Sequence, residues 1–165
     1  MDLKTLTLAS LELTEARLEQ FLTYQRVLLE ELARTDAKGG WSGRFAFAHQ
    51  HALTQAGLDV VTYEKVRAEV GDFYARSSTV ELVRGRVALA RQKVAAAQAG
   101  SADPADQRLL DRADRELPAL EDWGEFRARY GPAALALLQR RAEEVTRLHR
   151  AVAVAEGCPK GQIGT

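Results

Sequence analysis

Apolar residues recur at steps of three and four over most of the chain from residue 14 onward. This period gathers them on one face of an α-helix, whereas a half-buried strand alternates at every second residue. Thr14 suits the N-cap of a first helix over about 15–34, because its hydroxyl can accept from a free amide of the first turn. The apolar face of this helix consists of Leu18, Phe21, Leu22, Leu28, Leu29 and Leu32.

Glycines separate the next two helical regions. A short helix is expected over about 43–56, and Gly57 follows it where a left-handed C-cap is wanted. A long helical region follows over about 62–98. Its stripe favours either one long helix or two helices in line that break near Ser78, and the pattern alone leaves both open.

Two prolines mark where later helices begin. Asp103 followed by Pro104 is typical of a helix start, since aspartate caps the first turn and proline is accepted at the first helical position. Pro118 should kink this helix, because proline has no amide to donate and clashes with the preceding turn. A last helix is expected from Pro132 to about residue 156.

These elements predict an all-α protein with one helical-bundle domain over 14–156. Short connections favour antiparallel neighbours, so we expect an up-down bundle of four to five amphipathic helices. Residues 1–13 have imperfect alternation and no strand to pair with, and an isolated strand is unstable, so an extended N-terminal arm fits better. Residues 157–165 lack periodicity and should form a mobile tail.

Composition narrows the class of protein. The chain has 165 residues with 23 basic and 23 acidic side chains, so its formal net charge is zero. Nucleic-acid binding draws on an excess of Lys and Arg, and a membrane span needs about 18 apolar residues in a row, so neither partner is expected. One cysteine cannot form an intrachain disulfide, and the N-terminus does not resemble a secretion signal, so we expect a cytoplasmic protein.

Charge changes sign abruptly within the second half of the chain. Residues 82–102 contain no acid, whereas residues 103–125 contain eight acids. An antiparallel hairpin of these two segments would be electrostatically complementary. Alternatively, the basic segment is a docking patch for an acidic partner, formed by Arg84, Arg86, Arg91 and Lys93.

No motif for catalysis, metal or cofactor is apparent. Three histidines and Cys158 are the only imidazole or thiol ligands, and His49 and His51 point about 200° apart on a helix. Gly40 stands two residues before Ser42, as in a serine nucleophile elbow. The second glycine of that motif and the strand before it are missing. We therefore expect neither an enzyme, nor a metal site, nor a bound cofactor.

One constellation is compatible with a small ligand. Histidines on inward-facing stripes can change charge near neutral pH. Aromatic side chains stand at positions from which they could lie near these histidines. The predicted interhelical pocket would be lined by Tyr24, His49, Tyr63, Trp123 and His149. The simpler interpretation is a set of core-edge histidines bonded to a carbonyl or to a tyrosine hydroxyl.

The sequence thus favours a non-enzymatic interaction protein that associates with itself, as a homodimer, or with another helical protein. The long helical region spans more than the core of a small domain needs, so part of its surface is available to a second copy. A small-ligand or sensor bundle is the alternative hypothesis.

Overall fold

The computed structural model describes residues 12–34, 41–97 and 103–157. Within these ranges the chain forms seven helices and no strand, which confirms the prediction of an all-α protein. Apart from residues 12, 13 and 157, the expected arm and tail lie outside the described residues. The helices are α2 (Glu15–Arg34), α3 (Trp41–Ala56), α4 (Val60–Ala96), α5 (Pro104–Glu121), α6 (Gly124–Tyr130), α7 (Pro132–Arg140) and α8 (Ala142–Gly157).

Helix starts follow the capping signals of the sequence. The Arg17 amide donates to Thr14 Oγ1 at 3.3 Å at the start of α2. Asp103 accepts from the Ala105 amide at 2.8 Å and caps α5, with Pro104 as the first helical residue. Asp59 caps α4 in the same way, through the Thr62 amide at 2.9 Å. Each carboxylate or hydroxyl satisfies an amide that has no partner within its helix.

The structure decides between the two alternatives for the long helical region and differs from the sequence prediction at two other places. α4 is one continuous helix of 37 residues, so the alternative with a break near Ser78 does not apply. The chain expected to form one kinked helix after residue 103 is divided, because α5 ends at Glu121, one turn after Pro118, and α6 follows. The last predicted helix is divided at Arg141 into α7 and α8.

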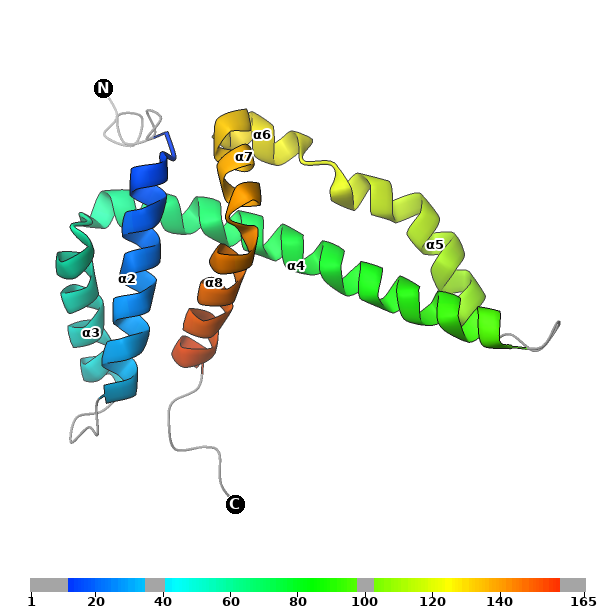
Figure 1. The fold of residues 1–165 in the computed structure, drawn as a ribbon, viewed down its shortest axis with the longest axis horizontal. Helices are drawn as coiled ribbons and strands as arrows, with labels where there is room; N and C mark the ends of the chain where they lie inside the picture. Colours follow the sequence, from blue (N-terminus) through cyan, green and yellow to red (C-terminus); the bar gives the residue numbers. More distant parts are fainter. Residues whose placement is uncertain (1–11, 35–40, 98–102, 158–165) are drawn as a thin grey trace, which may run out of the picture.

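The main core lies where α2 packs between α3 and α8 and the first half of α4 crosses them (Figure 1). Its apolar side chains come from all four helices and from α6 and α7. Burying each large aliphatic side chain contributes roughly 1.5–3 kcal/mol relative to leaving it in water. The most deeply buried include Leu18, Phe21, Leu22, Leu28, Val70, Phe73, Leu138 and Val145.

The second half of α4 leaves this core and packs against α5 as a two-helix hairpin (Figure 1). Its buried side chains, Val80, Val87, Ala90 and Ala113, do not belong to the core cluster. The expected up-down bundle therefore does not describe the whole molecule, because α4 is too long for the bundle and carries α5 away from it.

Arg76 fixes the point where the hairpin returns to the core. Its guanidinium donates to the carbonyls of Leu120 at 3.1 Å and of Ala119 at 3.0 Å, and also to that of Asp122. These carbonyls belong to the end of α5, where helical groups lack partners within the helix. The guanidinium also lies 5.5 Å from the ring centroid of Trp123.

Candidate functional site

Three of the five predicted pocket residues meet at the interface of α2, α3 and α4. The Tyr24 hydroxyl oxygen lies 2.7 Å from His49 Nδ1 and donates to the Tyr63 hydroxyl oxygen at 3.4 Å. The two tyrosine rings have centroids 4.7 Å apart, and the His49 ring lies edge-on to both. This triad matches the simpler interpretation of the sequence, a histidine satisfied by a tyrosine hydroxyl.

Burial moves the titration of both phenols to higher pH. It raises the pKa of Tyr24 far above its usual range, and the hydrogen bond with Tyr63 raises it further. Burial also raises the pKa of Tyr63. Both hydroxyls therefore stay protonated to a pH above the usual range for tyrosine, and the contacts of Tyr24 with His49 and Tyr63 join α2, α3 and α4.

His149 lies on α8, across a small cavity from Tyr24 and Tyr63. Burial lowers the pKa of His149, and the charge of Arg67 lowers it further, so the ring stays neutral. Its Nδ1 is buried and has no hydrogen-bond partner among the described residues. The ring packs on Tyr74, with centroids 4.7 Å apart.

The cavity has a volume of about 90 Å³ and an unpaired acceptor in its wall. Gln25 lines it, is 1% exposed, and has no partner for Oε1 among the described residues. An apolar cavity of about 150 Å³ accommodates benzene, so this one holds only a smaller molecule or a few waters. The lining residues are Phe21, Tyr24, Gln25, Tyr63, Arg67, His149, Val152, Ala153 and Glu156.

Trp123 does not belong to this cavity. It stacks on Phe73, with ring centroids 5.2 Å apart, and lies edge-on to Phe126 at 5.7 Å. These contacts are at the junction of α4 and α6, beside Arg76. The sequence included Trp123 in the predicted pocket but could not indicate which helices it would contact.

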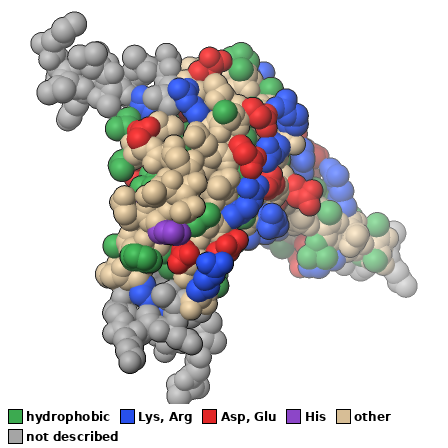
Figure 2. All heavy atoms as spheres, turned by 60° about the vertical axis from the view of Figure 1, so that its left-hand side comes forward, with side chains coloured by type: hydrophobic (Ala, Val, Ile, Leu, Met, Phe, Trp, Pro, Cys, Tyr) green, Lys and Arg blue, Asp and Glu red, His purple; other side chains and the backbone are tan. Residues whose placement is uncertain are grey.

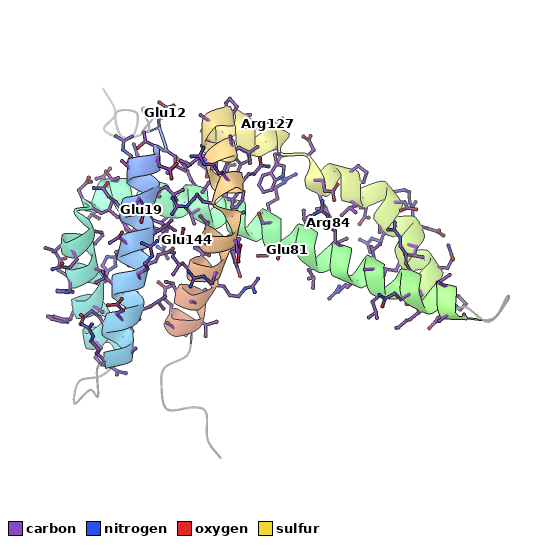
Figure 3. The ribbon with its side chains drawn as sticks, in the orientation of Figure 1. Glu12, Glu19, Glu81, Arg84, Arg127 and Glu144 are labelled. Carbon is purple, nitrogen blue, oxygen red and sulfur yellow. The ribbon has the colours of Figure 1, made fainter. Side chains whose placement is uncertain are left out.

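The four predicted docking residues lie on the hairpin half of α4, and three of them face acids of α5. Arg84 pairs with Glu121 at 2.7 Å, Arg91 with Asp114 at 3.7 Å and Lys93 with Asp106 at 3.9 Å. Figure 3 shows Arg84 on the side of α4 that is turned toward α5. Arg86 has no ion-pair partner among the residues that the structure describes. The complementary hairpin of the sequence analysis is therefore present.

An ionic cluster that the sequence analysis did not identify joins α2 to the α7–α8 junction. Arg141 pairs with Glu15 at 2.8 Å, with Glu19 at 2.8 Å and with Glu144 at 2.6 Å. Arg26 also pairs with Glu19, at 3.0 Å, and with Glu144. The side chains of Glu19 and Glu144 lie between the two helices in Figure 3. These arginines lower the pKa of both carboxyls.

Glu69 is the second group that the sequence did not indicate. It lies on α4, is 8% exposed, and has no partner for Oε2 among the described residues. Burial raises its pKa to about 7, although the charges of Arg17 and Lys65 oppose the rise. Its position on the α4 stripe, three residues after Val66, was the only available sign that it would be buried.

Other chemistry is not apparent in the described residues. No group of three or more His, Cys, Asp or Glu side chains is placed to hold a metal ion within 12–34, 41–97 and 103–157. None of the described helices combines the length and the apolar character that a membrane span needs. On the face drawn in Figure 2, acidic and basic side chains are interleaved and do not separate into areas of one sign.

The fold and these sites define an all-α protein with a four-helix core and a projecting two-helix hairpin. No protein-family model, curated protein or solved structure matches the chain.

Proposed function

We propose that this is a non-enzymatic interaction protein that associates with a second copy of itself through the α4–α5 hairpin. The observation that supports it is the position of the hairpin, outside the core and two helices thick. α5 does not cover all the apolar side chains of α4, because Leu82 and Leu89 are 56% and 53% exposed. Figure 2 shows apolar side chains at the surface of this projecting part.

A hairpin of this kind gains stability from a further layer of helices. Single exposed apolar residues are normal on a protein surface, but two leucines seven residues apart form a stripe on one helix face. Helices recognise one another through such stripes, whose side chains insert between those of the partner. The chain has no net charge to keep copies apart. A cytoplasmic location agrees with this function and stays a prediction.

Sedimentation velocity over a range of protein concentrations tests the proposal. Wild-type protein should show a sedimentation coefficient that rises with concentration. The double variant Leu82→Gln, Leu89→Gln should remain monomeric over the same range. The matched control is Phe47→Gln, Val154→Gln, which changes two side chains 66% and 63% exposed on the core. If the control variant loses association and the hairpin variant keeps it, the binding element is not the hairpin.

A small-ligand site in the cavity beside His149 is the second candidate function. The unpaired atoms Gln25 Oε1 and His149 Nδ1 favour it, since buried polar atoms normally have partners. The cavity of about 90 Å³ restricts the ligand to a polar molecule smaller than benzene. Native mass spectrometry of the purified chain should then show a small added mass on wild type that is absent from His149→Leu. Wild-type protein without added mass would contradict this candidate.

A further inference from the structure

The α4–α5 hairpin has two sides of different chemistry, and the ion pairs of the hairpin define them. Arg84 and Arg91 are seven residues apart and therefore share a face of α4. Their partners on α5, Glu121 and Asp114, are also seven apart and share a face. Both pairs thus lie on the same side of the hairpin. Asp111, three residues before Asp114, lies next to it on that side.

The first side is acidic at its surface. The carboxylates of Glu121 and Asp114 already have cations in the chain, but Asp111 has no ion-pair partner among the described residues. Glu81, three residues before Arg84, adds a second carboxylate without a described ion pair. We call this the acidic side. Between its charges α4 presents two small exposed side chains, Ala88 and Ala95, again seven residues apart, and the exposed Gln92.

The opposite side carries leucines and cations. Leu82, Arg86, Leu89 and Lys93 each lie two residues from Arg84 or Arg91, and residues two apart on a helix point about 200° apart. Their own spacing of four, three and four places them on one stripe. We call this the leucine side.

On α5, Arg112 lies two residues before Asp114, so it too is turned away from the acidic side. Arg108 stands four residues earlier, on the same stripe as Arg112. Arg108 has no ion-pair partner in the described part of the chain, whereas Arg112 pairs with Glu116 at 2.9 Å. The leucine side therefore carries one cation without a described ion pair on each helix, Arg86 on α4 and Arg108 on α5, whereas Lys93 is already paired with Asp106.

We infer that the leucine side of one copy docks on the acidic side of a second copy, so that copies associate head to tail. This inference rests on the proposed self-association and specifies its geometry. Two leucine sides would bring Arg86 and Arg108 of each copy against like charges, which disfavours a symmetric dimer through this surface. The acidic side offers the opposite charge, and its two alanines have the same seven-residue spacing as the two leucines.

In a head-to-tail contact, each copy uses one of its two sides. The assembly therefore always has a free leucine side at one end and a free acidic side at the other, so further copies can add beyond a dimer. The 18 residues of α5 span about 27 Å, and two helices side by side are about 20 Å wide. This footprint of roughly 500 Å² is below the ~800 Å² per partner of a standard stable interface, so we expect weak association that needs high protein concentration.

Two variants, each of which changes one side of the hairpin, test the head-to-tail geometry. Leu82→Gln, Arg86→Gln, Leu89→Gln removes the leucine side, and Glu81→Gln, Asp111→Asn neutralises the acidic side. Neither set touches the ion pairs of Arg84, Arg91 or Lys93, so both hairpins should fold, which circular dichroism checks. In sedimentation velocity up to about 500 µM protein, wild type should grow past the dimer, and 0.5 M NaCl should reduce this growth because salt screens the charges.

Each variant alone should associate at least tenfold more weakly than wild type. An equimolar mixture of the two should form a 1:1 dimer and nothing larger, because one intact leucine side and one intact acidic side remain. A wild-type dimer that does not grow, or a mixture that stays monomeric, would overturn the head-to-tail geometry while leaving self-association in place. Wild-type protein that is monomeric at every concentration would overturn both.

Discussion

At the scale of single residues, the buried polar side chains separate into satisfied and unsatisfied groups. Tyr24 is buried and satisfied, because its hydroxyl contacts His49 and Tyr63. Glu69 is buried without a partner for Oε2 among the described residues. Removing a satisfied group and removing an unsatisfied one should change stability in opposite directions, since an unpaired buried polar atom carries a desolvation cost.

Tyr24→Phe should lower the free energy of unfolding by about 1–2 kcal/mol. The substitution keeps the ring packing but removes the hydroxyl, and it leaves His49 Nδ1 without its described partner. Urea denaturation measures the change. Tyr74→Phe is the matched control, because the Tyr74 hydroxyl accepts from Arg150 at a long distance of 3.5 Å and does not contact the triad. Equal losses in the two variants would show that the triad contributes nothing specific.

Glu69 should make stability depend on pH between about 4.5 and 7. Burial raises the pKa of Glu69 from 4.5 to about 7 in the folded chain, so the folded state prefers the protonated carboxyl. This preference is fully present below pH 4.5 and is lost as pH rises through about 7. At pH 8 the ionised carboxylate should cost the wild type up to about 3 kcal/mol.

Glu69→Gln should therefore be more stable than wild type at pH 8 and nearly equal to it at pH 4.5. The comparison with Glu69→Gln is needed because Glu19 and Glu144 have the opposite effect on the pH dependence. Their pKa values are lowered, so the protein loses stability when they are protonated at low pH. Urea midpoints at both pH values measure the difference. The control Glu64→Gln changes an exposed carboxylate on the same helix, and its stability relative to wild type should not change between the two pH values. A pH-independent difference for Glu69→Gln would be incompatible with a raised pKa.

At the scale of helices, Arg141 stands at the junction of α7 and α8 and carries the ion pairs that join this junction to α2. The chain between Pro132 and residue 156 has continuous helical periodicity, yet α7 ends at Arg140 and α8 begins at Ala142. Arg141, between them, extends to two glutamates of α2 and to Glu144. The cluster thus fixes the junction of the two helices against α2, and neither Arg141 nor its partners stand out from other charged residues in the sequence.

Arg141→Met should lower the free energy of unfolding by about 2 kcal/mol. Arg141 is only 24% exposed and joins three carboxylates, whereas an isolated surface pair contributes about 0–1 kcal/mol. The control Arg112→Met removes an exposed pair with Glu116 within α5 and should cost less than 1 kcal/mol. Urea denaturation at low and high salt measures both. A loss for Arg141→Met no larger than that of the control would contradict the role of the cluster.

At the scale of the whole molecule, the core and the hairpin differ in how much apolar surface they bury. α2 has helices packed on more than one side, whereas α5 is covered mainly by α4. The seam between the two hairpin helices has few fully buried side chains. Opening the hairpin therefore exposes less apolar surface than opening the core, and it leaves the core intact.

Hydrogen exchange should show this difference directly. Amides of α5 and of α4 after Val80 should exchange through local opening, with protection lower by at least tenfold than amides of α2. Protein concentrations low enough to keep the chain monomeric are required, since association would protect the hairpin. Arg76→Ala should lower the protection of α5 further and leave α2 unchanged, because it removes the bonds to the end of α5. Equal protection of α2 and α5 would mean that the molecule opens as one unit.

The sequence by itself determined the helical content, most helix starts and the complementary charges of the α4–α5 hairpin. These features depend on local spacing: caps at Thr14 and Asp103, apolar steps of three and four, and a change of charge sign at residue 103. It also placed His49 and Tyr63 on inward faces and suggested Tyr24 as a neighbour of His49. Local patterns suffice for such features because they depend on residues within one or two turns.

Only the tertiary structure decided how the helices are arranged in space. Periodicity is the same for a helix inside a bundle and for one that projects, so the length of α4 indicated that it exceeds the core, but its pattern did not reveal which half leaves the core. It likewise did not reveal that Trp123 packs on Phe73, away from the other predicted pocket residues. Contacts between distant segments, such as those of Arg141 with α2, depend on which helices pack together, and that choice is made by the whole core.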